Sequence, residues 1–358
     1  MPWTSLCITE DDVSGFERNG HRCISYADAL REAQESILEQ DSNAFVIGEG
    51  VDDFGGVFGS TKGLVDKFGS DRVMDAPIAE NGLTGVAIAA AAVGMKPIFV
   101  HMRADFLPMC MDQIVNHAAK WHFMSGGQTC IPLVIRSIIG RGWGSVAQHS
   151  QGLHSMFLSV PGLKIALPTT PYDAKGMLLA AYKDPNPVLL FEHRWLYSLK
   201  GPVPEDDYTV SLGKAVVRHQ GSDITVVAVS QSVLQAANAA AQLASQGIEV
   251  EVVDPRSLFP LDMDAIKASV KKTGRLVICD VANRNAGYGA EIACRIAEDD
   301  PTMLRAPVRR VSFPDLPTPA SSTLEEAFYP GEEDIIQAIM SVMGKEPPLP
   351  YDYTKAVM

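Results

Sequence analysis

Short apolar runs alternate along the chain with longer segments whose apolar residues recur at helical spacing. We interpret the runs as buried strands and the segments between them as helices. In the first half, the predicted strands are 44–50, 96–102, 132–139, 163–168 and 187–193, and the predicted helices are 27–40, 81–94, 109–124 and 173–184. Ser25, followed three residues later by Asp28, forms a variant capping box before the first helix. The alternation predicts an α/β fold with a parallel sheet covered on both faces.

A polar stretch with several Pro and Gly residues, 198–214, interrupts this pattern and marks the best boundary between two domains. A second α/β set follows it, with strands predicted at 223–230, 248–255, 275–282 and 308–314 and a helix at 233–247. We therefore predict four parts: an N-terminal extension (1–24), a first α/β domain (25–200), a smaller α/β domain (201–343) and a Pro-rich tail (344–358).

The charge balance narrows the class of partner. Of 358 residues, 30 are Lys or Arg and 43 are Asp or Glu, which gives a formal net charge of −13. No basic surplus exists to neutralise phosphates, which argues against binding to nucleic acid or to an anionic membrane. The six cysteines have no zinc spacing, and the N-terminal residues lack a signal-peptide core. The most apolar stretch, 86–93, is shorter than the roughly 20 residues of a membrane span, so we expect a cytoplasmic protein.

Three residues stand out as candidates for chemistry. Glu80 lies at a strand-to-helix junction, where a carboxylate would be dehydrated and suited to proton transfer; the alternative is a helix N-terminal residue that satisfies backbone donors. His149 follows the glycine-rich residues 140–145, where a ligand could approach, or it is a surface histidine. Phe106 follows a strand end and either stacks on a ring or fills the core.

Several motifs occur in a fixed order between about residue 24 and residue 343. They are IAENGLTGVAIAAAAVGMKPI, ADFLPMCMDQIVNHAAKW, PLVIRSIIGRGWGSVAQHSQ, DPNPVLLFEHRWLY, VEVVDPRSLFPLD, TGRLVICDVA and APVRRVSFPD. Together they resemble the β subunits (E1β) of thiamine-diphosphate-dependent 2-oxo acid dehydrogenases, of the pyruvate, branched-chain and acetoin types. The resemblance implies a transketolase-like pyrimidine-binding domain followed by a transketolase C-terminal-like domain.

The resemblance also implies roles for particular residues. Glu80 corresponds to the glutamate that bonds N1′ of the cofactor's aminopyrimidine, and His149 to a histidine near the reacting centre, so both are expected to be catalytic. Further cofactor-binding residues are expected at Phe106, Ile78, Met102 and Glu49. In some relatives a potassium ion binds near the positions of Leu133, Ala181, Asp184 and Asn186. A plain turn at DPNP is the alternative there.

The family's diphosphate-binding GDG motif and its asparagine do not occur in this chain. The resemblance therefore implies a separate E1α-type subunit that supplies the diphosphate and Mg²⁺ ligands, an α2β2 heterotetramer, and docking to a lipoyl acyltransferase, E2. The implied reaction is the oxidative decarboxylation of a 2-oxo acid, pyruvate foremost, or the cleavage of acetoin, with acyl transfer to lipoamide. Two alternatives stay open: a transketolase-like or synthase half-enzyme without a lipoyl partner, and a non-catalytic scaffold subunit.

Overall fold

The computed structural model describes residues 2–141 and 144–345, and the chain divides into two compact units. Unit 1 contains the residues up to 139 and residues 157–212, and unit 2 contains residues 140–156 and those from 213 onward. Most of the predicted Pro-rich tail, 346–358, lies outside the described residues. No helix in the described ranges is long and apolar enough to cross a membrane.

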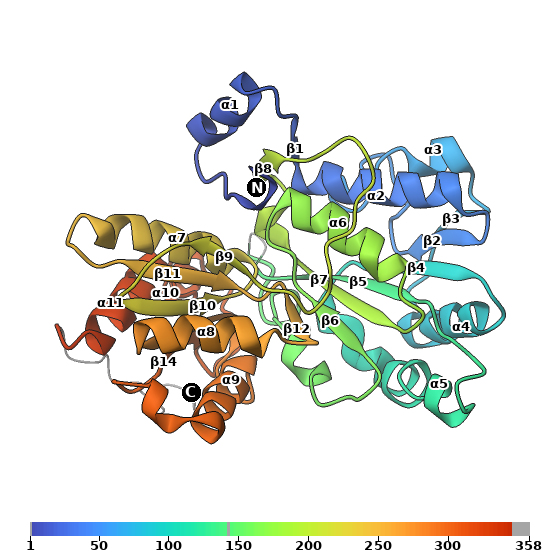
Figure 1. Ribbon diagram of the computed structural model, residues 1–358. Helices are drawn as coiled ribbons and strands as arrows, with labels where there is room; N and C mark the ends of the chain where they lie inside the picture. Colours follow the sequence, from blue (N-terminus) through green and yellow to red (C-terminus); the bar gives the residue numbers. More distant parts are fainter. Residues whose placement is uncertain (1, 142–143, 346–358) are drawn as a thin grey trace. The chain divides into compact units, whose positions relative to one another are not determined.

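The core of unit 1 is a parallel sheet with the strand order β6-β7-β5-β4-β2-β3 (Figure 1). Its strands are β2 (Ala44–Gly48), β3 (Val73–Asp75), β4 (Lys96–His101), β5 (Val134–Ile139), β6 (Lys164–Ala166) and β7 (Val188–His193). Every residue of β2, β5 and β7 is buried. Burial on both faces is what continuous apolar strands predict, so the expected parallel α/β sheet is confirmed.

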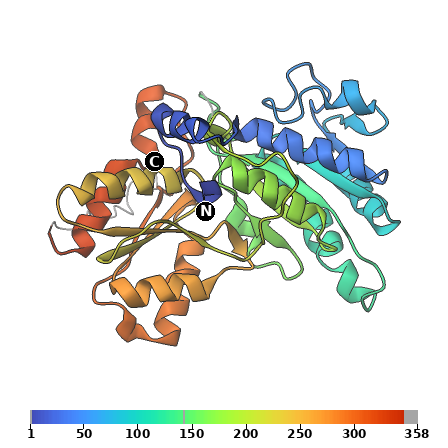
Figure 2. The ribbon, with the colours of Figure 1, turned by 45° about the horizontal axis from the view of Figure 1, so that its top comes forward.

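Helices cover this sheet on both faces (Figures 1 and 2). On one face, α2 (Tyr26–Gln40) packs against α6 (Pro171–Tyr182); on the other, α4 (Glu80–Ala92) packs against β4. The Ser25 side chain accepts a hydrogen bond from the backbone N–H of Asp28, which confirms the predicted start of α2. The shorter elements of unit 1 are η1 (Pro2–Thr4), α1 (Glu10–Arg18), β1 (Cys23–Ser25), α3 (Leu64–Phe68), η5 (Arg194–Leu196) and β8 (Lys200–Pro202).

The helix predicted over 109–124 is wrong as a continuous element. The chain instead forms a 3-10 segment, η2 (Ala104–Cys110), a wide π-helical turn, η3 (Gln113–Ala118), and the single turn α5 (Trp121–Met124). Pro108 within η2 has no N–H to donate, which favours irregular turns over a regular helix. Both η2 and η3 contact α4, so the irregular segment supports the helix that begins at Glu80.

A polar network lies in the centre of unit 1 around Arg136, whose side chain is fully buried. Its Nε donates to Glu192 Oε1 at 2.6 Å and its Nη2 to Glu192 Oε2 at 2.8 Å. The same guanidinium donates to Gln34 Oε1 and to Ser60 Oγ, both at 2.9 Å. Tyr197 Oη donates to Glu192 Oε2 at 2.5 Å. Arg136 therefore joins β5, β7 and α2 to the glycine-rich loop that follows β2.

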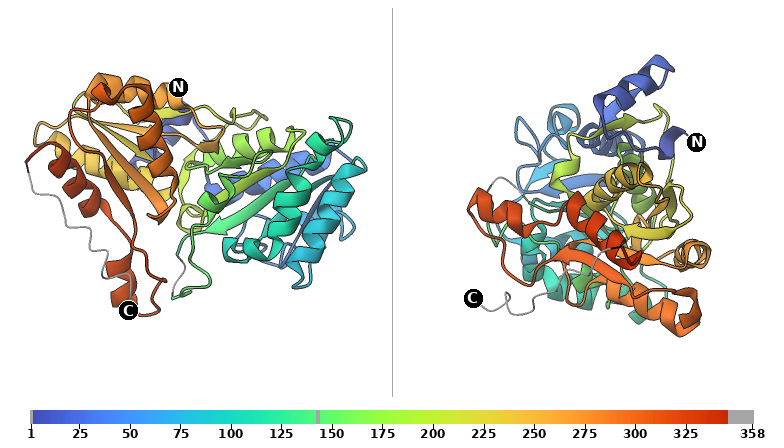
Figure 3. Two further views of the ribbon diagram at one scale, coloured as in Figure 1. Left: turned by 90° about the horizontal axis from the view of Figure 1, so that it is seen from below. Right: turned by 90° about the vertical axis from the view of Figure 1, so that its left-hand side faces the viewer.

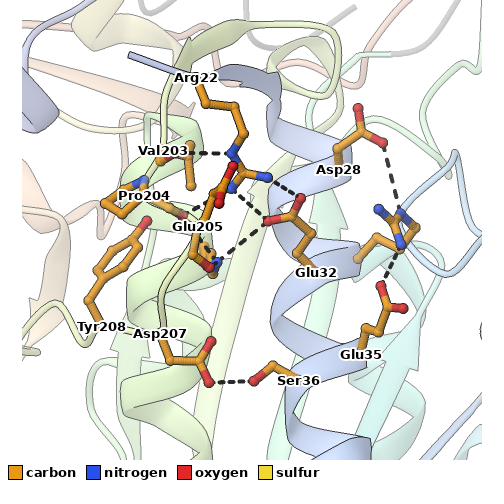
Figure 4. Close-up of polar contacts among 12 residues, drawn as sticks. Arg22, Asp28, Glu32, Glu35, Ser36, Val203, Pro204, Glu205, Asp207 and Tyr208 are labelled. Carbon is orange, nitrogen blue, oxygen red and sulfur yellow. Dashed lines mark hydrogen bonds and ion pairs between the residues drawn. The ribbon is translucent and has the colours of Figure 1, made fainter. Parts of the chain in front are cut away.

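A second network holds the entry and exit segments of unit 1 together (Figure 4). Arg22 pairs with Glu32 of α2 at 2.7 Å, and its Nη2 donates to the carbonyl of Pro204 at 2.9 Å. Lys175 of α6 donates to the same carbonyl at 3.2 Å and lies 3.5 Å from Glu32. The antiparallel pairing of β1 with β8 lies beside this network. Chain segments about 180 residues apart in sequence are thereby fastened to α2.

Unit 2 is a second α/β sheet with the strand order β14-β13-β10-β11-β9 (Figure 3). β9 (Val216–His219) pairs antiparallel, while β10 (Ile224–Ala228), β11 (Val250–Asp254), β13 (Leu276–Asn283) and β14 (Arg309–Phe313) are parallel. Helices α7 (Gln231–Ala244) and α11 (Glu332–Val342) lie together on one face, and α8 (Met263–Thr273) and α9 (Tyr288–Asp299) on the other (Figure 3). Unit 2 also contains β12 (Ser257–Phe259), η6 (Pro301–Met303) and α10 (Ser322–Phe328).

Candidate active site

Glu80 is the first residue of α4, and its side chain is only 6% exposed. The preceding residue, Ala79, has no side chain that could cap the helix, so the positive end of the helix dipole acts on Glu80 directly. Among the described residues, Glu80 Oε2 has no hydrogen-bond partner. A buried carboxylate oxygen without a partner is costly unless a ligand or water completes it. Glu80 is therefore poised to accept a hydrogen bond from a bound molecule.

Two uncharged groups lie behind Glu80. Thr84 Oγ1 donates to the Glu80 carbonyl at 2.7 Å and lies 3.5 Å from His101 Nε2 at the end of β4. Burial lowers the pKa of His101 to about 4, so this ring is neutral at physiological pH. The neutral ring therefore adds no positive charge beside Glu80.

Glu49 directly follows β2. A Cβ on Gly48 would lie 2.3 Å from the Val100 carbonyl oxygen, so only glycine allows β2 to approach β4 this closely before the chain reaches Glu49. The next residue, Gly50, donates its N–H to Asp75 Oδ1 at 2.8 Å. Burial, and then the charges of Glu80 and Asp75, raise the pKa of Glu49 above its ordinary value of 4.5. Three acidic side chains therefore act on one another at the carboxyl edge of the sheet.

Replacing Glu49 with glutamine is expected to make the stability of unit 1 less sensitive to rising pH. The folded wild-type protein binds the proton more tightly than the unfolded chain, so stability is fully present below pH 4.5 and is lost as pH rises through the raised pKa. In Glu49→Gln this loss disappears, and the variant gains up to about 1 kcal/mol over the wild type, because a half-buried group is partly screened. Urea unfolding at a series of pH values measures the difference; parallel stability curves would contradict the expectation.

The three apolar residues predicted to contact the cofactor differ in how deeply they are buried. Met102, which follows β4, is half-buried, and its Cε lies 3.3 Å from where a Cβ on Gly50 would stand. Phe106 is half-buried in η2, and its N–H donates to the Arg103 carbonyl at 3.3 Å. Ile78 is 83% exposed. The carboxyl edge of the sheet thus brings Glu49, Met102 and Glu80 into one region, while Ile78 is packed against little of unit 1.

His149 belongs to unit 2, in the segment 140–156. It is partly exposed, and its N–H donates to the carbonyl of Val146, whose φ of 54° makes the turn before it. The same segment contains a histidine that sequence reasoning did not select. His154 is fully buried, and its Nε2 lies 2.9 Å from Asp280 Oδ1 on β13. The sequence does not reveal this difference, because the two histidines differ in burial.

Of the predicted potassium positions, Ala181, Asp184 and Asn186 lie at the C-terminal end of α6 and in the turn after it, and Leu133 directly precedes β5. The Ala181 carbonyl accepts the N–H of Asp184 at 3.1 Å, and the Leu133 carbonyl accepts the N–H of Val188 at 2.9 Å. The Asp184 carboxylate pairs with Lys164 and accepts the N–H of Asn186. These contacts are those of a capped turn, and the potassium site stays a prediction. The described part of the chain also holds no group of three or more His, Cys, Asp or Glu side chains suited to a metal ion.

Sequence reasoning missed Asp75, Thr84 and His101 as parts of the site. Asp75 and His101 are the last residues of β3 and β4, and strand ends meet at one edge of a parallel sheet. For His101, a polar residue that ends a buried strand was the available signal, whereas β3 is short and partly exposed and gave no such signal for Asp75. Thr84 could have been found from its place one helical turn after Glu80.

Comparisons with known proteins agree with this architecture. Family models match residues 22–200, as the transketolase pyrimidine binding domain, and residues 213–335, as the transketolase C-terminal domain. A solved structure, a split gene transketolase in an inactive beta4 tetramer, aligns with a TM-score of 0.71 at 20% identity and covers 90% of this chain and 98% of its own. At that identity the structural similarity establishes the fold alone.

Three relatives are similar over nearly their whole length. The β subunit of an acetoin:2,6-dichlorophenolindophenol oxidoreductase from Bacillus subtilis is 45% identical, covering 90% of this chain and 98% of the relative. The pyruvate dehydrogenase E1 β subunit of Porphyra purpurea is 44% identical, covering 88% and 96%. The 2-oxoisovalerate dehydrogenase β subunit of B. subtilis is 41% identical, covering 88% and 97%. With both domain models in order, the chain belongs to the family of E1β subunits of the thiamine-diphosphate-dependent 2-oxo acid and acetoin dehydrogenases, a family of oxidoreductases.

Proposed function

We propose that the carboxyl edge of the unit 1 sheet binds the aminopyrimidine of thiamine diphosphate, and that Glu80 is the residue that activates it. The observation that carries this proposal is the buried Glu80 Oε2, which has no hydrogen-bond partner among the described residues. When bound, thiamine diphosphate supplies a nucleophilic thiazolium carbon and an electron sink for the loss of carbon dioxide or for the cleavage of a carbon–carbon bond next to a carbonyl.

The residues of this edge fit a flat, basic ring. Glu80 would hold a proton at ring nitrogen N1′, and the neutral ring of His101 and the acidic Glu49 and Asp75 lie at the same edge of the sheet. Met102 and Phe106 offer half-buried apolar surface for the ring faces. Phe106 lies in η2, which contacts α4, so the segment that begins at Glu80 also supports the proposed ring contact.

We further propose that an α-type subunit completes the site with the diphosphate and Mg²⁺ ligands. The test is calorimetric titration of thiamine diphosphate with Mg²⁺ into the chain alone and into the chain copurified with its α-type partner. Saturable binding only to the pair is the expected result. Equally tight binding to the lone chain contradicts a shared site, and absence of binding to both contradicts the proposed function and favours a scaffold subunit.

An exposed apolar surface on unit 1 suits such a partner. Val86 of α4 is 56% exposed and Val93, directly after α4, is 82% exposed; on α5, Phe123 is 86% and Met124 is 70% exposed. α4 also presents Gly82 and Ala89 to solvent, and such small residues allow a second helix to approach closely. Apolar side chains this exposed mark interaction surfaces.

Replacing Phe123 with aspartate is expected to weaken association with the α-type subunit by about thirtyfold, the equivalent of about 2 kcal/mol at an aromatic contact of an interface. Surface plasmon resonance with an immobilised α-type subunit measures the change. Leu324→Asp, which alters a 59% exposed residue on α10, is the matched control and should bind as the wild type does. Equal affinity of the Phe123 variant and the wild type would remove this surface from the interface.

For the substrate we propose pyruvate or acetoin, followed by acyl transfer to the lipoamide of an acyltransferase. The relatives named for acetoin and for pyruvate are 45% and 44% identical, so similarity alone does not choose between the two. Reduction of 2,6-dichlorophenolindophenol by the α–β pair, with each substrate in turn, separates them. The expected result is turnover of at least one of the two; turnover of neither contradicts this assignment.

A further inference from the structure

Unit 2 contains a cavity of about 210 Å³ that the proposed function does not use. It is lined by residues of β13 and β14 and of the first turns of α7, which follows β10, and of α11. This volume is smaller than the roughly 300–1,000 Å³ of sites for drug-sized ligands, so its occupant is a small molecule.

The cavity lies where the strand order of the sheet reverses. From β10 the chain crosses through α7 to β11, and then through α8 to β13, and these two strands flank β10 on opposite sides. In open α/β sheets this reversal leaves a crevice at the strand ends in which ligands bind. The position of the cavity is therefore that of a binding site rather than of a packing defect.

One side of the cavity favours a negatively charged group. Gln231 and Ser232, the first residues of the 14-residue helix α7, line it. The first turn of α7 contains no acidic residue, and the side chain of its N-cap, Ser230, makes no capping hydrogen bond. Arg141 also lines the cavity, with its guanidinium 4.8 Å from the centre of the Tyr329 ring. A helix N-terminus and a guanidinium together favour a carboxylate.

Another part of the cavity lining is acidic and favours a positively charged group. Asp280 lines the cavity and is 5% exposed; its Oδ1 lies 2.9 Å from His154 Nε2. Its Oδ2 has no hydrogen-bond partner among the residues that the structure describes. Glu326, an exposed residue of α10, adds a second carboxylate to the lining. These acids favour an ammonium group.

The remaining lining is apolar. Val281 of β13, Val311 and Phe313 of β14, and Ile335 of α11 contribute hydrocarbon surface, and Val281 and Ile335 are almost wholly buried. An occupant with one anionic group, one cationic group and a short apolar part would match all three kinds of lining.

We propose that this cavity binds a free α-amino acid with an apolar side chain. Its carboxylate faces the N-terminus of α7 and Arg141, its ammonium faces Asp280 and Glu326, and its side chain packs on Val311, Phe313 and Ile335. This site goes beyond the proposed function and does not depend on it, because every residue named belongs to unit 2.

Isothermal titration of the full chain with three probes tests the proposal. The probes are L-leucine, 4-methylpentanoate, which lacks the ammonium group, and 3-methylbutylamine, which lacks the carboxylate. We expect leucine to bind with a Kd below about 1 mM and each of the other probes to bind at least about tenfold more weakly. Absence of saturable leucine binding, or equal binding of all three probes, overturns the proposal.

Variants then locate the binding. Arg141→Gln should weaken the binding of leucine and of 4-methylpentanoate by about tenfold and leave the binding of 3-methylbutylamine unchanged. Glu326→Gln and Asp280→Asn should each weaken the binding of leucine and of 3-methylbutylamine and leave the binding of 4-methylpentanoate unchanged. Glu326→Gln is a surface change that leaves the fold intact. Arg295→Gln, an exposed charge on α9 outside the lining, is the control. Binding that is the same in all four variants lies elsewhere and overturns the proposal.

Discussion

Replacing Arg136 with alanine is expected to lower the free energy of unfolding by about 3–5 kcal/mol, because the fully buried Glu192 would keep a negative charge without its cation. The loss extends beyond the ion pair, since Gln34 Oε1 and Ser60 Oγ lose their donor as well. Urea unfolding followed by circular dichroism measures the change. An effect of this size is a large part of the stability of a typical domain.

Arg31→Ala is the matched control. Arg31 pairs with Glu35 at 2.7 Å on α2, and because the two side chains stay 28% and 26% exposed, this partly solvated pair is expected to contribute no more than about 1 kcal/mol. A double variant, Arg136→Met with Glu192→Leu, removes both buried charges and should recover much of the loss. If Arg136→Ala costs no more than Arg31→Ala, the buried network does not stabilise unit 1.

Replacing Glu80 with glutamine is expected to lower the turnover of the α–β pair by about 10²- to 10⁴-fold, the range that a positioned general acid–base group supplies. The amide matches the carboxylate in shape, yet it cannot hold or release a proton at the ring nitrogen. Dye reduction under saturating thiamine diphosphate measures the loss. Since Glu80 Oε2 has no hydrogen-bond partner among the described residues, the neutral amide should not lower the stability of unit 1.

Two measurements keep this result interpretable. Calorimetric titration should show that Glu80→Gln with its α-type partner still binds thiamine diphosphate, so the loss lies in the chemical step. Glu39→Gln, the same change at an exposed position on α2 that pairs with Lys67, should retain full turnover. Unchanged turnover in the Glu80 variant would remove Glu80 from the mechanism.

The sequence predicted most of the elements because their apolar patterns are long and regular. The runs that became β2, β4, β5 and β7 are apolar almost throughout, and the Ser25–Asp28 cap marks the start of α2. The segment 104–124 was predicted less well. Its apolar residues follow a nearly helical spacing, and the break near Pro108 depends on packing against α4, which local pattern does not report.

Some residues of the site could likewise be predicted from the sequence, and others could not. Glu80 was found because it lies at a strand-to-helix junction, whereas Glu49 and Met102 were named only by the family resemblance. The neutral His101 was not found, because its low pKa comes from burial beneath the strand end. The cavity of unit 2 was likewise invisible in the sequence, since Arg141, Asp280 and Phe313 are far apart along the chain and meet only in the folded unit.

The route of the chain has a consequence for anyone who wishes to divide this protein. The chain passes between the units at 139–140, 156–157 and 212–213, so unit 2 includes the segment 140–156, which is encoded in the middle of unit 1. A fragment beginning at residue 213 would lose His154, the partner of Asp280, and Gly152, where an added Cβ would stand 2.2 Å from the Val281 carbonyl oxygen. A chimaera that joins two relatives at the 198–214 boundary therefore receives a unit 2 without its own residues 140–156. A working chimaera needs residues 140–156 carried over with the domain they complete.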